Sequence, residues 1–290
     1  MPQDSDEQPR AQFENLSGVA TRRTFLTTVG VAALSALAGC QGSKDTEETG
    51  NEDTDENELG GVASDENDTP EPLDPPEGTS EDGIEDTEKL VDATRTALTK
   101  NSYAIEQELV NTTDGEQTLH VTQRRTSNLD SNKRLLVFDA ATETNRLYIE
   151  NGTQFIRSTS DDETTTQSRS FQEDFRATHP PEMLGGGESL GGILRTGAFA
   201  SPETVSKSGL LLLQFELDSV DESEISGTVT EETATIFVDT NSVVHKATRS
   251  LEIEEDAQTV TLDQSFVIHQ LGDVSVERPD WADKAAKENR

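Results

Sequence analysis

Cys40 is the only cysteine of the chain, and the residues around it are those of a lipid-attachment site. It closes the stretch Leu37-Ala38-Gly39-Cys40, which resembles a lipobox, where a signal peptidase cuts before the cysteine and the thiol carries a lipid. Upstream lies the twin-arginine pattern Thr21-Arg22-Arg23-Thr24-Phe25-Leu26, followed by an uncharged, Ala- and Leu-rich run. These features predict twin-arginine export and a lipid anchor that holds the protein on the extracellular face of the cell membrane.

Two other interpretations of this region stay open. The uncharged stretch 24–43 is just long enough to span a membrane as an uncleaved helix. A lone cysteine is also most often a buried free thiol. The position of Cys40 at the end of a lipobox favours lipidation over both.

The other residues form no pattern typical of a catalytic or metal site. The chain has neither a Gly-x-Ser-x-Gly elbow nor a His-Glu-x-x-His motif, and His179, His245 and His269 are far apart in the sequence. The glycines of 185–192 lack the Gly-Lys-Ser/Thr ending of a phosphate-binding loop. Pairs of carboxylates carry no information in a chain with 58 acidic residues. We therefore expect no enzyme activity, no cofactor and no bound metal, and an extracellular hydrolase is only a minor alternative.

The charge balance excludes one class of partner. Among 290 residues, 58 are acidic and 23 are basic, which gives a formal net charge of −35. Nucleic-acid-binding proteins need a basic stripe against the phosphates, and this chain lacks one. Acidity on this scale is typical of disordered segments, and also of folded proteins from halophilic archaea, which are rich in Asp and Glu and poor in Lys. We expect both causes to apply, in different segments.

Composition divides the chain into three parts. Residues 1–39 are the predicted signal peptide. Residues 40–83 are predicted to be a disordered tether, because they are acidic and proline-containing, without aromatic residues or apolar periodicity. Residues 84–290 are then one folded domain.

This domain is predicted to begin with a helix and to continue mainly as strands. Asp86 is a suitable N-cap for a helix that ends near Asn101, and alternating apolar residues after it indicate strands. The pair Asn151-Gly152 predicts a tight hairpin, because both residues can adopt positive φ. In 170–200, apolar residues set among two glycine clusters predict two short helices with a hinge. The order predicts an α+β fold, with a curled antiparallel half-barrel sheet, an N-terminal helix and a helical lid insert.

Several segments together resemble haloarchaeal lipoproteins of unknown function. They are the lipobox, the acidic tether, the strand NSYAIEQEL, the hairpin RLYIENGTQFIR and the ending VSVERPDWAD. The layout of residues 86–282 is similar to the half-barrel lipoprotein-carrier superfamily, which includes the periplasmic lipoprotein carrier and the mycobacterial lipid-binding lipoproteins. The resemblance implies a cavity for acyl chains between sheet and helices, with 170–200 as its lid. Shuttling between membranes is not implied, because an archaeon of this kind has no outer membrane.

The function implied by this resemblance is binding of an apolar, lipid-like or amphiphilic ligand. We expect the ligand to contact apolar residues of the lid and of the second half of the sheet, namely Phe175, Leu194, Leu213, Phe215 and Phe266. The alternative is a structural or interaction lipoprotein of the cell envelope, with a filled core and no pocket.

Polar residues on the strand faces predicted to meet the helices also leave two interpretations open. They are Gln107, Gln123, His245 and Gln264. An amphiphilic pocket explains them, and so do ordinary buried hydrogen bonds.

Three Asn-x-Ser/Thr sequons are candidate glycosylation sites, at Asn67, Asn111 and Asn151. The last two lie in predicted turns.

Overall fold

The computed structural model describes most of the chain from residue 72 onward. The described residues are 72–160, 163–170, 174–176, 188–207, 209–222 and 225–288. The twin-arginine pattern, the lipobox with Cys40, the sequon at Asn67 and most of the predicted tether lie outside them. No helix within the described residues is both long and apolar enough to cross a membrane.

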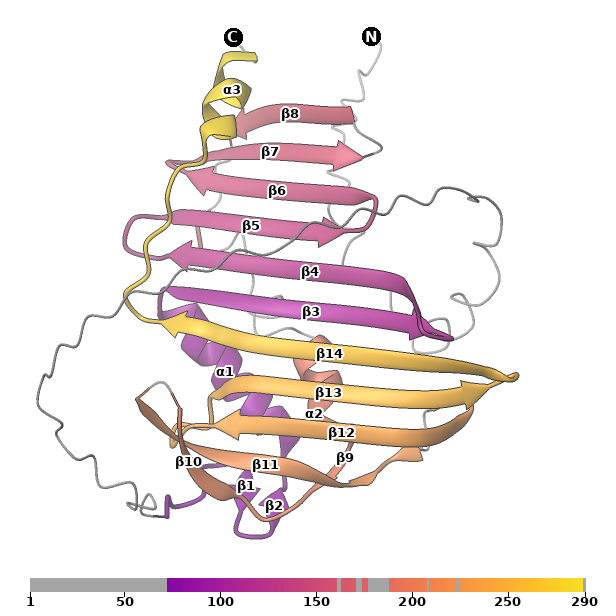
Figure 1. Ribbon diagram of the computed structural model, residues 1–290. Coiled ribbons are helices and arrows are strands. Elements are labelled where there is room, and N and C mark those ends of the chain that lie inside the picture. The colour runs from indigo at the N-terminus through magenta and orange to yellow at the C-terminus, as the bar shows by residue number, and fades with distance from the viewer. Residues whose placement is uncertain are drawn as a thin grey trace, which may run out of the picture. The chain divides into compact units, whose positions relative to one another are not determined.

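One large antiparallel sheet dominates the described part of the chain (Figure 1). It has twelve strands, and its order is β10-β11-β12-β13-β14-β3-β4-β5-β6-β7-β8, with β9 pairing β11. The bounds are β3 Tyr103–Thr113, β4 Glu116–Asn128, β5 Lys133–Ala140, β6 Glu143–Glu150, β7 Thr153–Ser160, β8 Glu163–Ser170, β9 Gly197–Phe199, β10 Glu203–Lys207, β11 Leu210–Val220, β12 Thr228–Val238, β13 Val244–Glu255 and β14 Gln258–Leu271. The strands β14 and β3 join the two halves of the chain in the middle of the sheet.

The sheet curls without closing, as a half-barrel does, because β10 and β8 form its two ends and do not pair with each other. The expectation of an α+β fold needs one correction, since the described residues form a mainly β structure. Their helices are α1 Thr87–Lys100, α2 Glu188–Leu194 and α3 Asp280–Glu288. Many of the strands are long, because the alternation of apolar and polar residues continues over segments of up to 14 residues. Little of the described chain is therefore left for helices.

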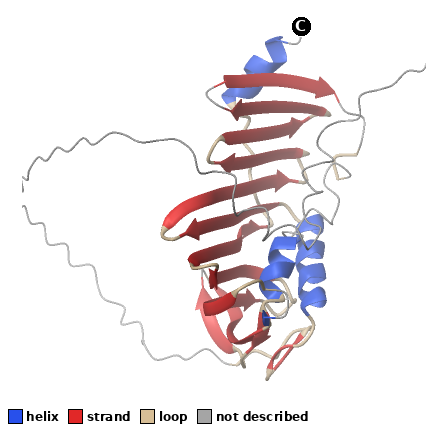
Figure 2. Cartoon of the chain, turned by 90° about the vertical axis from the view of Figure 1, so that its right-hand side faces the viewer, coloured by secondary structure: helices blue, strands red, loops and turns tan. Residues whose placement is uncertain are grey.

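The first helix begins where the sequence predicts. The Asp86 side chain accepts a hydrogen bond from the backbone N–H of Lys89 at 3.1 Å, which caps α1. Its apolar stripe packs against the sheet together with α2. Figure 2 shows both helices on one side of the lower half of the sheet, while the strands toward β8 extend beyond them. We call the face under α1 and α2, which carries Tyr103, Ile105 and Phe266, the inner face, and the opposite face the outer face.

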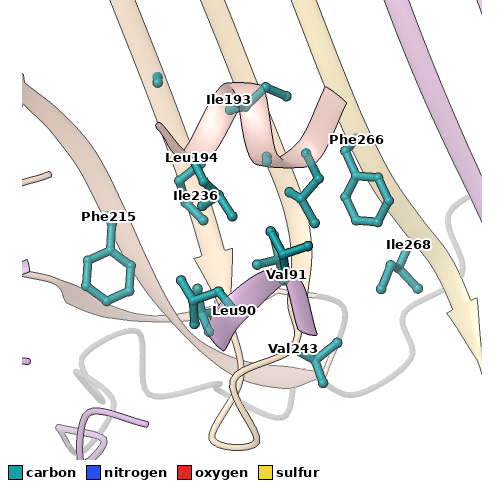
Figure 3. Close-up of a cluster of buried hydrophobic side chains, with 14 of the residues drawn as sticks. Leu90, Val91, Ile193, Leu194, Phe215, Ile236, Val243, Phe266 and Ile268 are labelled. Atoms are coloured by element: carbon teal, nitrogen blue, oxygen red, sulfur yellow. The ribbon is translucent and has the colours of Figure 1, made fainter. Parts of the chain in front are cut away.

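The main core lies between these two helices and the inner face. Leu90 and Val91 of α1 and Leu194 of α2 fill the space toward Ile236 and Phe266 of the sheet (Figure 3). Leu90, Leu194, Ile236 and Phe266 are 0% exposed. Burial of this apolar surface holds the helices to the sheet.

A second, smaller core lies on the outer face. In the register, Tyr103 lies opposite Ser127, Ser127 opposite Arg134, and Arg134 opposite Ile149, so these residues share the inner face. Because side chains alternate along a strand, Tyr148 points to the outer face. There Tyr148 and Phe155 pack against Trp281, Ala282 and Ala285 of α3. The terminal helix and the other two therefore cover opposite faces of the sheet.

The expected hairpin is present, whereas only part of the expected insert falls within the described residues. Asn151 and Gly152 have φ values of 51° and 71° and connect β6 to β7 as a two-residue turn. In the insert, the described helix is α2, which is followed by the strand β9. The apolar and glycine residues of 177–187 lie outside the described residues.

Defined structure begins before residue 84. The strands β1 Thr79–Ser80 and β2 Gly83–Ile84 pair with each other, and the backbone N–H of Leu73 donates to Thr204 Oγ1 at 3.1 Å. Leu73 also packs against the main core. The last residues of the segment predicted as a tether are therefore attached to the sheet.

Candidate functional site

The five residues expected to contact a ligand do not form one site. Leu194, Leu213, Phe215 and Phe266 are together, but as members of the main core, where each is at most 2% exposed. Phe175 lies elsewhere, over the side chain of Arg134 on β5, with 4.4 Å between the guanidinium carbon and the ring centroid. The part of the core beneath α2 is thus filled by side chains from sheet and helix.

The inner face carries a row of residues across β3 to β7 that begins in the main core at Ile105 and is apolar at every position except Arg125; we call it the apolar row. The register aligns Ile105, Arg125, Leu136, Leu147 and Ile156, one residue from each strand from β3 to β7. Ile105 and Ile156 are buried, and Leu136 and Leu147 are half-buried. Four steps of about 4.8 Å between neighbouring strands give the row a length of roughly 19 Å. This row continues the main core outward along the sheet.

A second row, with two glutamines between two phenylalanines, lies beside the apolar one. Phe266, Gln107, Gln123 and Phe138 are aligned across β14, β3, β4 and β5. Gln123 Oε1 accepts a hydrogen bond from Arg125 at 2.9 Å, whereas Gln107 Nε2 is buried without a hydrogen-bond partner among the described residues. The buried Asn111 Oδ1, further along β3, also has none there. Buried polar atoms are nearly always satisfied, so these two atoms are candidates for hydrogen bonds to groups outside the described residues, such as water or a ligand.

Two buried cations complete this part of the inner face. Arg125 and Arg134 are 7% and 2% exposed. Burial lowers the pKa of Arg125, and it lowers the pKa of Arg134 to about 10, so Arg134 stays charged at neutral pH. Burial also raises the pKa of the neighbouring Tyr103 phenol. An apolar row, amide groups and guanidinium donors therefore lie side by side, which is the combination an amphiphilic molecule needs.

Of the four polar residues that left two interpretations open, one has an ordinary hydrogen bond and the others lie on the inner face. His245 Nε2 lies 3.0 Å from Asp239 Oδ2, so it is an ordinary hydrogen-bonded residue at the turn between β12 and β13. Gln107 and Gln123 belong to the row described above. Gln264 lies on the inner face as well, opposite Leu109 and Arg249.

The described residues offer no grouping of three or more His, Cys, Asp or Glu that could hold a metal ion. A depression of about 280 Å³ lies on the outer face of β3 and β12 to β14, and its lining includes Thr233, Thr235, Thr248, Ser250 and Ser265. Of the sequons, Asn151 is exposed at its turn, while Asn111 is buried on the inner face, where a glycan would not fit.

The comparisons with known proteins find no family model and no curated protein that matches this chain. Among solved structures, LprF from Mycobacterium bovis is similar at 14% identity, with a TM-score of 0.29, over 68% of this chain and 99% of LprF. A LolA superfamily protein from Nitrosomonas europaea is similar at 9% identity and a TM-score of 0.22, over 67% of this chain and 96% of that protein. A chain of the Pseudomonas aeruginosa MucA/MucB complex is similar at 12% identity and a TM-score of 0.26, over 68% of this chain and 60% of that chain. At these identities and TM-scores, the similarities do not decide the family or the ligand of this chain.

Sequence reasoning missed the inner-face rows of β4 to β7. Arg125 looks like a surface residue in the sequence, because polar or charged residues surround it, and Arg134 does so because Asn132 and Lys133 precede it. The available signal was the alternation in Leu136, Phe138, Leu147 and Ile156, which marks one face of two consecutive hairpins.

Proposed function

We propose that this chain is a non-enzymatic binding protein that is anchored to the membrane through a lipid on Cys40. Its ligand is an apolar or amphiphilic molecule that lies on the inner face of β3 to β7, beyond the core under α2. The polar end of the ligand bonds to Gln107 and Arg125, and its apolar part lies along Leu136, Leu147 and Ile156.

The observation that carries this proposal is the buried Gln107 Nε2, which has no hydrogen-bond partner in the described part of the chain and lies beside an apolar row that continues the core. A buried amide without a partner costs about 1–3 kcal/mol, which a ligand acceptor would recover. The apolar row offers the surface along which a chain of methylene groups would be removed from water.

Native mass spectrometry tests the ligand. The full chain, purified at high salt without detergent, should retain a co-purified lipid-like mass. Leu147→Gln should reduce the liganded fraction by about tenfold, because it places an amide in the apolar row. Leu210→Gln is the matched control, since Leu210 is 46% exposed. A clean apo mass for the unmodified chain would refute the proposed ligand.

The anchor has a separate test. Cys40→Ser should block lipid attachment and leave the protein released or unprocessed. Unchanged membrane retention of a full-length chain would point to an uncleaved helix instead.

One observation favours the alternative function, a structural or interaction lipoprotein without a pocket. Leu194, Leu213, Phe215 and Phe266, the residues first expected to contact a ligand, fill the core completely. An apo mass combined with membrane retention that depends on Cys40 would select this alternative.

A further inference from the structure

Two arginines face each other on the outer face of β6 and β7. Arg146 lies directly opposite Arg157 in the register, and Thr144 lies opposite Thr159 in the next row of the same face. These four side chains line a depression of about 200 Å³. Opposite residues on antiparallel strands have Cβ atoms about 5 Å apart, so both guanidinium groups and both hydroxyls can reach one small ligand.

Neither arginine has a carboxylate partner among the described residues. No ion pair or hydrogen bond joins either guanidinium to another described side chain, and Arg146 Nε is buried without an acceptor. The nearest acid by register is Asp139, which lies opposite Thr144 and forms an ion pair with Arg124 at 3.7 Å. The positive charge of the pair is therefore uncompensated by the part of the chain that the structure describes.

Arg146 and Arg157 differ from other arginines of this acidic chain, which form ion pairs with carboxylates. The chain has 58 acidic residues, and other arginines use them: Arg249 pairs with Glu232, and Arg278 pairs with Glu150 and Asp283. Like charges directly opposite on neighbouring strands repel each other. An anion bound between Arg146 and Arg157 would remove that repulsion.

We propose that Arg146, Arg157, Thr144 and Thr159 bind a tetrahedral oxyanion, which is a phosphate or sulfate group. A doubly charged group neutralises both guanidiniums, and its several oxygens can accept from both Arg forks and both hydroxyls. A carboxylate has one charge and two oxygens, and it would leave donors unused. The site lies on the face opposite the proposed inner-face ligand, so it does not depend on that ligand.

Titration calorimetry tests this site in the full chain carrying Cys40→Ser, at high and constant NaCl concentration. Inorganic phosphate and sulfate should each bind saturably with one site per chain. Arg146→Gln and Arg157→Gln should each weaken binding by about tenfold. Arg169→Gln is the matched control, because Arg169 lies on the adjacent strand β8 but in the inner-face row of Gln154 and Ile149. It should leave the affinity unchanged.

A second measurement guards against loss of folding. The double variant should have a melting temperature no lower than that of the unmodified chain, and phosphate should raise the melting temperature of the unmodified chain only. Unchanged phosphate affinity in the double variant would overturn the proposal, and so would acetate binding as tightly as phosphate.

The source of the group is distinguished with vesicles of phosphatidylcholine, prepared with and without phosphatidic acid. Saturable binding of free phosphate assigns the site to a soluble anion. Binding only to vesicles that contain phosphatidic acid, lost in the double variant, assigns it to a lipid headgroup. Both results support the proposal, while no saturable binding in either arm refutes it.

Discussion

Glu232 and Arg249 form an ion pair on the inner face, with 2.9 Å between Arg249 Nε and Glu232 Oε1. The Glu232 side chain is 0% exposed, and the Thr196 hydroxyl, just after α2, donates to the same carboxylate oxygen. The pair therefore connects β12 and β13 to the segment that follows α2. The second oxygen, Oε2, is buried without a partner among the described residues.

Removing one member of this pair should destabilise the domain strongly. Arg249→Met leaves a buried, unpaired carboxylate, and we expect a loss of about 3–5 kcal/mol in the free energy of unfolding. Denaturant titration measures this value. The double variant Glu232→Met with Arg249→Met should be less destabilised than Arg249→Met alone, because it removes the unpaired carboxylate. A double-variant loss equal to the sum of the losses in Glu232→Met and Arg249→Met would show that the two residues are not coupled.

Two nearby glycines should respond in opposite ways to alanine. A Cβ at Gly197 would lie 1.9 Å from the carbonyl oxygen of Ser219, whereas a Cβ at Gly192 meets no atom within 4 Å. Gly197→Ala should push β9 from β11 and cost about 1–3 kcal/mol. Gly192→Ala, inside α2, should be neutral or stabilise by about 0.5–1 kcal/mol. Thermal unfolding of both variants, measured side by side, checks the difference, and similar melting temperatures would contradict the packing of β9 on β11.

Acid should weaken the turn between β12 and β13. Burial opposes ionisation of Asp239, but hydrogen bonds from His245 and from the backbone N–H groups of Val243 and Asn241 outweigh it, so the pKa of Asp239 lies below its ordinary value of 3.8. A carboxylate with a lowered pKa in the folded state stabilises the fold fully above pH 3.8. That contribution is lost as the pH falls below 3.8 and through the pKa of the folded state.

Unfolding midpoints measured from pH 6 down to pH 3 test this dependence. Asp239→Asn should lower the unfolding midpoint at pH 6. The difference between the midpoints of the variant and of the unmodified chain should become smaller as the pH falls. A difference in midpoint that grows in acid would show that the pKa of Asp239 is not lowered in the folded state.

The folded domain should require salt. Residues 84–290 contain 38 acidic and 19 basic side chains, and repulsion among the unpaired carboxylates rises as the salt concentration falls. Circular dichroism should show loss of the strand signal on dialysis from molar NaCl to dilute buffer, with recovery when salt is restored. A domain that stays folded in dilute buffer would contradict the halophilic interpretation.

Local features of the fold were predictable because a few neighbouring residues decide them. The cap at Asp86 depends on one carboxylate and a backbone N–H three residues later. The turn at Asn151-Gly152 depends on two residues that tolerate positive φ. The strand positions follow from alternation within each segment. The cap, the turn and the strand positions are therefore determined without information about distant parts of the chain.

The candidate site depends on register between strands, which alternation alone does not fix. The predicted turn fixes Leu147 opposite Ile156, but Leu147 is opposite Leu136 only because β5 and β6 pair in one alignment, and a shift of one residue would turn Leu147 to the other face. The ligand residues expected from the sequence were apolar and lay in the right region, but apolar character is equally typical of a filled core.

The sequence by itself determined where the first helix begins, where the tight turn between β6 and β7 lies, and the excess of carboxylates. Only the tertiary structure decided that α3 covers the face opposite α1 and α2. Such contacts join residues distant in the sequence, and their stability comes from surfaces buried between elements. No short segment contains both surfaces, so that information appears only when the sheet is assembled.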